Sequence, residues 1–134
     1  MIDLAIVSLP RLDLTRPAIA PAILSSLANQ RGIKNKVFDF ALATYDRSTR
    51  DDWHEYELFW QVDLKHQLEK ETKLKLDKLF DSFVDEVLKE NPSWIAISVF
   101  TYNSINATNL FLEKIRLKSN AKVIIGGVGI ETRI

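Results

Sequence analysis

The sequence predicts a parallel α/β sandwich, and two observations carry that prediction. Short apolar runs alternate along the chain with longer segments of helical periodicity. The runs at 3–9 and 94–101 are apolar at successive positions, which is typical of strands buried on both faces of a sheet. Strands that alternate with helices are joined by right-handed crossovers, so we expect a parallel sheet covered by helices on both sides.

The first strand is expected at 3–9. The segment 17–31 then places apolar residues at helical spacing, with Pro21 tolerated in the first turn and Gly32 suited to end the helix. A second strand is expected at 36–40, a short segment that contains Val37, Phe38 and Phe40.

A long helical excursion, about 42–91, separates the second strand from the third. Its second half repeats apolar residues at i, i+3 and i+4, at Leu76, Leu79, Phe80, Phe83, Val84, Val87 and Leu88. This helix is expected to end at Asn91, because Pro92 disfavours helical geometry in the residue before it. The segment 51–71 is also expected to be helical, although its pattern is less regular.

The third strand at 94–101 is followed by an expected helix at about 106–117 and a fourth strand at 122–125. The simplest arrangement is a flavodoxin-like three-layer sandwich with strand order 2-1-3-4, formed by the 134 residues as one domain. In such sheets ligands bind at the carboxyl ends of the strands, where the strand order reverses. The ends at 9–15 and 101–104 are therefore expected to flank a crevice.

Composition excludes several classes of function. Lys+Arg and Asp+Glu both number 18, so no net charge favours nucleic acid or an anionic membrane as a partner. There is no cysteine, which excludes disulfides, zinc–thiolate sites and iron–sulfur ligation by this chain. No apolar run approaches the roughly 20 residues of a membrane span, and no secretory signal is recognisable. The expected location is the cytoplasm.

Two glycines follow the fourth strand directly. Gly126 and Gly127 lack a Cβ, so they permit either the close approach of a ligand or a tight turn, and both interpretations stay open. The start of a dinucleotide-binding motif at 127–129 is rejected, because Thr132 stands where its third glycine belongs. The loop after the first strand lacks the glycines and lysine of a phosphate-binding loop.

No catalytic or metal site is predicted. His54 and His66 fall in the excursion, away from the expected crevice, and Asp63 near His66 makes a pair without a third ligand. No nucleophile has a base at a recognisable spacing. The hydroxyls and carboxylate of Asp13, Thr15 and Thr101 could bind a ligand, although capping of a loop is the commoner role for such residues.

An aromatic cluster occupies the excursion at helical spacing, formed by Trp53, Tyr56, Phe59 and Trp60. Packing onto the sheet is the more common role for such a cluster. The alternative is a partner surface, which would meet a second copy of the chain or a downstream domain, because aromatic side chains dominate interface energetics.

Several short motifs occur in a characteristic order along the chain. They are the residues Pro17, Pro21, Leu24, Leu27, Ala28 and Gly32, the tripeptide at 37–39, the segment 91–98, Thr101, and the segment 123–129. In this order the chain resembles the N-terminal cobalamin-binding domain of many radical S-adenosylmethionine enzymes. The resemblance covers nearly the whole chain except the excursion.

In that family the corrin lies over the carboxyl ends of the strands and its nucleotide tail slots into the sheet domain. The resemblance implies that the cofactor-binding residues are Leu9, Pro10, Asp13, Leu14 and Thr15 at the corrin, Ser98, Thr101 and Tyr102 beside the tail, and Gly126, Gly127, Val128 and Gly129 along its path.

The chain departs from the family in two ways. The Asp-x-His-x-x-Gly motif of classical cobalamin domains is absent, since no histidine precedes His54, which implies binding without a histidine ligand from the chain. The Cys-x-x-x-Cys-x-x-Cys motif that binds the iron–sulfur cluster in the radical enzymes is also absent, because the chain has no cysteine. The iron–sulfur cluster and S-adenosylmethionine would therefore belong to a separate downstream domain. The expectation is therefore the N-terminal part of a longer protein, not catalytic by itself. The alternative is a non-catalytic interaction or oligomerisation module that uses the same fold and binds no cofactor.

Overall fold

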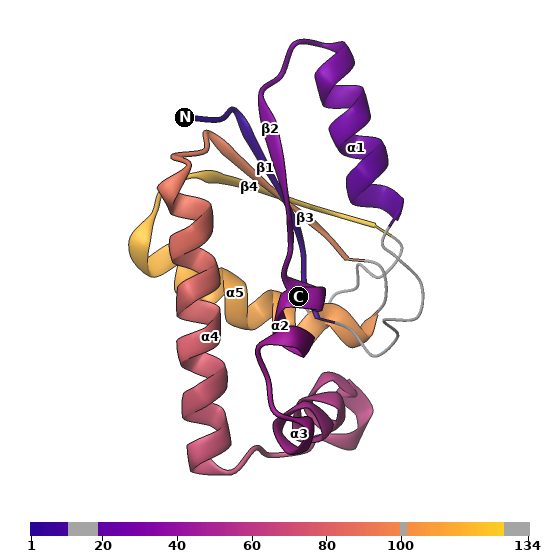
Figure 1. Ribbon diagram of the computed structural model, residues 1–134, viewed down its shortest axis with the longest axis vertical. Helices are drawn as coiled ribbons and strands as arrows, with labels where there is room; N and C mark the ends of the chain where they lie inside the picture. Colours follow the sequence, from indigo (N-terminus) through magenta and orange to yellow (C-terminus); the bar gives the residue numbers. More distant parts are fainter. Residues whose placement is uncertain (11–18, 100–101, 128–134) are drawn as a thin grey trace.

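The computed structural model describes residues 1–10, 19–99 and 102–127. Four parallel strands form one sheet in the order β2-β1-β3-β4. They are β1 (Leu4–Ser8), β2 (Asn35–Asp39), β3 (Trp94–Ser98) and β4 (Lys122–Gly126). The predicted fold class and strand order are confirmed, and helices lie on both faces of the sheet (Figure 1).

The four strands are aligned without offset. Leu4 at the start of β1 pairs with Asn35 and Trp94, and Trp94 pairs with Lys122. Because all four strands are five residues long, they also end at the same level. The sheet therefore has one straight carboxyl edge.

One face of the sheet carries the main core. It is covered by α2 (Phe40–Asp46), α4 (Lys70–Lys89) and α5 (Ile105–Lys118) (Figure 1). Helix α3 (Arg50–Trp60) lies beyond the carboxyl ends of β1 and β2 and packs against α5. Short 3-10 turns follow α3, as η1 (Val62–Leu64), and precede α5, as η2 (Tyr102–Ser104). Val7, Ile95 and Ile97 point into this layer and are buried. The rings of Phe40 and Phe83 stack at 4.2 Å between centroids, which fixes the start of α2 against α4.

The other face is only half covered by the described residues. Helix α1 (Ile19–Gln30) lies over β1 and β2 and buries Pro21, Ala28 and the side chain of Ile6. Its large apolar side chains instead face outward and are exposed, at Ile19, Ile23, Leu24 and Leu27. No other described helix covers this face, and Ile124 on β4 is 49% exposed there.

Helix boundaries differ from the sequence expectations at two places. Phe40 was expected to end the second strand but begins α2, because the Asp39 carboxylate accepts a hydrogen bond from the Leu42 N–H at 3.1 Å and caps the helix. The expected helix at 51–71 ends at Trp60. The chain then passes through η1 to Lys65, whose φ of 50° is left-handed and stops helical geometry.

The aromatic cluster of α3 lies largely in the core. Trp53, Tyr56 and Trp60 are buried and Phe59 is half-buried, with the Trp60 ring 6.3 Å from that of Phe80. This placement agrees with the packing interpretation. Assembly through the cluster stays a prediction, and it would require these rings to leave the core. In the described ranges no helix is long and apolar enough to cross a membrane.

Candidate binding site at the carboxyl edge of the sheet

Four residues stand side by side at the carboxyl edge of the sheet. The register pairs Ser8 with Asp39 on one side and with Ser98 on the other, and Ser98 pairs with Gly126. Side chains in one row point to the same face, and successive residues of a strand alternate between faces. Because Val7 and Ile97 point into the core, this row points to the face that carries α1. We call these four residues the carboxyl-edge row.

The row is small and polar where the neighbouring positions are large and apolar. Two hydroxyls, one carboxylate and a glycine follow directly after the apolar row formed by Val7, Phe38, Ile97 and Ile125. Ser8 is 4% exposed, so its hydroxyl lies below the surface and not on a solvated loop. This edge can therefore offer hydrogen-bonding groups to a ligand that lies flat on the ends of the strands.

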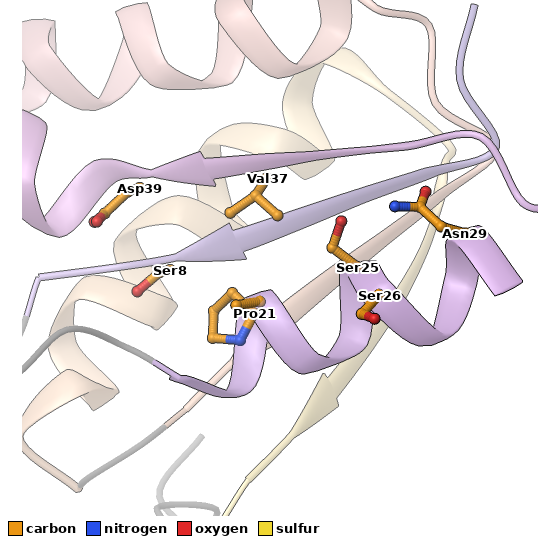
Figure 2. A pocket seen from close by; sticks show the side chains of 8 residues that line it. Ser8, Pro21, Ser25, Ser26, Asn29, Val37 and Asp39 are labelled. Carbon is orange, nitrogen blue, oxygen red and sulfur yellow. The ribbon is translucent and has the colours of Figure 1, made fainter.

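A groove opens between the row and α1. It has a volume of about 450 Å³ and is lined by Ser8, Pro21, Ala22, Ser25, Ser26, Asn29, Val37 and Asp39. Figure 2 shows Ser8 near Pro21 in the first turn of α1, with Ser25 and Asn29 farther along the helix. We call this space the α1 groove.

Hydrogen bonds between side chains hold the helical wall of the α1 groove. The Ser25 hydroxyl donates to the Asn35 Oδ1 at 2.5 Å, and the Asn35 amide donates to Asn29 Oδ1 at 2.7 Å. These bonds tie α1 to the start of β2. The spacing between helix and sheet is thus set by specific polar contacts as well as by the buried Pro21 and Ala28.

The two glycines after β4 have different environments. A Cβ on Gly126 would meet no atom within 4 Å, so open space lies above this position. Gly127 has a φ of 124° and lies against the carbonyl group of Val99, which leaves no room for a side chain. Close approach of the backbone and a tight turn explain Gly127, whereas Gly126 is open to a ligand.

The structure brings only some of the expected site residues together at the carboxyl edge. Ser98 and Gly126 lie together in the carboxyl-edge row. Leu9 is 2% exposed and packs into the core, so that only its backbone reaches the edge, and Pro10 is also buried. The predictions for Asp13, Leu14, Thr15, Thr101, Val128 and Gly129 lie outside the described residues, as does the side chain of Tyr102, whose backbone belongs to η2.

Ser8 and Asp39 were not among the predicted site residues, although Asp39 belongs to the motif at 37–39. Their signal was present, since Ser8 is the one hydroxyl in the apolar run 3–9 and Asp39 is the one acidic residue in the expected strand 36–40. What could not be read was the register that brings both beside Ser98.

The histidines do not line the α1 groove. His66 Nε2 is 2.7 Å from Glu55 Oε2, and His54 Nδ1 is 3.4 Å from Glu57 Oε1. These pairs belong to α3 and the segment after η1, and α3 lies at the other end of the molecule from α1 (Figure 1). In the part of the chain that the structure describes, no three carboxylate or histidine groups converge as a metal site requires.

Comparison of the chain with protein-family models, with curated proteins and with solved structures finds no match. An α/β sandwich of this kind hosts many unrelated functions, so the fold alone does not specify a ligand. A functional argument has to start from the carboxyl-edge row and the α1 groove.

Proposed function

We propose that the chain is a cobalamin-binding module, which holds the corrin for radical or methyl-transfer chemistry completed by a separate domain. One observation supports this most directly. The carboxyl-edge row combines small and polar groups on the sheet face that the described helices leave half uncovered. The sequence resemblance adds that cobalamin domains use this edge of the sheet.

The described residues fit the nucleotide tail of such a cofactor. A planar, polar tail needs a flat floor without bulky side chains, and Ser98 and Gly126 provide one at the end of β3 and β4. Hydroxyl groups both donate and accept hydrogen bonds, so Ser8 and Ser98 can orient ring nitrogens or ribose oxygens. The backbone at Leu9 and Pro10 lies at the same edge, where the corrin would rest.

The residues of this chain would bind and orient the cofactor. A bound cobalamin supplies the organometallic chemistry, and the chain supplies position and surroundings. Neither His54 nor His66 lines the α1 groove, and neither is assigned a role as a cobalt ligand.

Titration with hydroxocobalamin tests the proposal. The purified chain should give a saturable change in corrin absorbance, and the corrin should elute with it on gel filtration. Gly126→Val should weaken binding at least tenfold without unfolding the chain, because a Cβ there meets no neighbouring atom but occupies the floor. Ser93→Val is the matched control, since the exposed Ser93 precedes the opposite end of β3 and should leave binding unchanged. A chain that binds no corrin, or binds it equally with Gly126→Val, contradicts this proposal.

A non-catalytic interaction module is the second candidate, and α1 favours it. This helix contains no charged residue among its 12 positions, although four of its large apolar side chains are exposed. Exposed apolar surface of this kind marks interaction sites. A folded chain that binds no corrin but associates through α1 would support this candidate over the first.

A further inference from the structure

β2 has an open edge in the described structure. Among the described residues it pairs only with β1, on one side. In a parallel ladder, the N–H and C=O of one residue point to the same neighbouring strand, and the side to which they point alternates from one residue to the next. The Lys34 carbonyl accepts a hydrogen bond from the Leu4 N–H at 3.1 Å, so Lys36 and Phe38 turn toward β1. Val37, in the middle of the strand, therefore turns its N–H and C=O to the open edge.

Grooves flank this edge on both faces of the sheet. The α1 groove lies on one face. On the other face a groove of about 370 Å³ is lined by Lys36, Val37, Phe38, Asp39, Phe40, Ala43, Arg47, Glu86, Lys89 and Glu90, and we call it the α4 groove. Val37 and Asp39 line both, and α1 and α4 lie on opposite sides of β2 (Figure 1). Space on both faces is what an added strand needs, because its side chains alternate.

The usual protection of an edge strand is weak here. Natural sheets guard open edges with charged side chains, lysine above all. Lys36 is the one lysine within β2, but its Nζ lies 3.0 Å from Glu90 Oε1 and 5.3 Å from the centroid of the Phe38 ring. It is thus held against its own chain, while Val37 stays 38% exposed at the centre of the edge.

We propose that β2 pairs with β2 of a second copy, antiparallel and centred on Val37, so that two sheets become one. Val37 and the partner's Val37 would exchange both backbone hydrogen bonds across the two-fold axis. Lys36 then lies opposite the partner's Phe38, and Asn35 opposite the partner's Asp39. No like charges face each other directly in this register, so the strand does not repel its own copy. This self-matching register, together with the uncharged helix α1 that packs on β2, is the reason to assign the edge to a second copy.

Helix α1 supplies the remaining contact surface. Two five-residue strands alone bury much less than the roughly 1,200 Å² of a stable interface. The two-fold axis places both α1 helices on the same face of the joined sheet, beside the paired strands. Ile19 and Ile23 are 67% and 53% exposed, and the helix carries no charge, so its burial desolvates no ionised group.

Sedimentation of the full chain over a concentration range up to about 1 mM, the weak end of specific association, provides the first test. A monomer–dimer equilibrium is expected. Val37→Glu and Val37→Lys should each weaken dimerisation at least tenfold, because each places two like charges across the axis. An equimolar mixture of the two variants should restore a heterodimer with one copy of each. Circular dichroism verifies that both variants stay folded.

The matched control is Ile124→Glu, which makes a similar change at the middle of the opposite edge strand, β4, and should leave dimerisation unchanged. A chain that is monomeric throughout, a dimer that persists in both Val37 variants, a mixture that fails to restore association, or dissociation by Ile124→Glu would each overturn the proposal. None of these outcomes depends on cobalamin, so the proposed function is tested separately.

Discussion

The Val99 N–H donates a hydrogen bond to the Gly126 carbonyl oxygen at 2.8 Å, just beyond the last ladder pair of β3 and β4. The bond holds the two chain segments together where they leave the sheet. Gly127 follows with a left-handed φ of 124° and lies directly against the Val99 carbonyl. The open floor at Gly126 therefore depends on a turn at the next residue that only glycine can make.

Gly127→Ala is expected to lower the free energy of unfolding by about 1–3 kcal/mol through backbone strain, with a further loss from the collision with Val99. Gly126→Ala is the control, because its added methyl group enters open space at an ordinary φ. It should leave stability unchanged or raise it by about 0.5 kcal/mol. Urea unfolding of both variants measures the difference. Equal effects of the two substitutions would contradict this account of the turn.

The strand positions were predictable because short apolar runs indicate them locally. Runs such as that ending at Ser98 are apolar on both faces. The strand order was predictable because strands that alternate with helices allow few topologies. The start of α2 was not predictable in the same way. Phe40 extends the apolar pattern of β2, and the Asp39 cap that ends the strand competes with that pattern.

The candidate site was predicted only in part, because it depends on register. Ser98 and Gly126 were expected at one crevice, and they are direct partners. Ser8 was missed, since its position in the row is set by pairing with residues about 30 and 90 positions away. Leu9 adjoins Ser8 in sequence, but its side chain points into the core, because successive residues of a strand face opposite sides.

Asp39→Ala is expected to destabilise the chain by about 1 kcal/mol, because the Leu42 N–H loses the carboxylate that caps α2. Asp39→Asn keeps an oxygen at the cap and should retain most of the stability. Thermal unfolding of the two variants separates the roles of this side chain. If Asp39→Asn were as damaging as Asp39→Ala, the charge and not the cap would be the cause.

Phe83→Ala is expected to lower the free energy of unfolding by about 3–5 kcal/mol, because Phe83 is fully buried and stacks on Phe40. Leu74→Ala on the same helix is the control, since Leu74 is half exposed and should change stability by less than about 0.5 kcal/mol. Chemical denaturation of both variants provides the comparison. Should Phe83→Ala prove too unstable to purify, Phe83→Leu leaves a smaller cavity and still exceeds the control.

Tyr56 gives the core a dependence on alkaline pH. Its burial, and secondarily the negative charge of Asp52, raise the pKa of its phenol from 10 to about 12. The folded state therefore favours the protonated phenol more than the unfolded state does. This stabilisation is fully present below pH 10 and is lost as the pH rises from about 10 through 12.

Over that interval the free energy of unfolding of the wild-type chain should fall by about 2–3 kcal/mol relative to that of Tyr56→Phe, which has no phenol to ionise. The free energy of unfolding of both proteins is measured at several pH values between 8 and about 12. Tyr45→Phe alters an exposed ring and serves as the control for general effects of alkali. A difference between wild type and Tyr56→Phe that stays constant with pH would show that the buried phenol does not couple ionisation to folding.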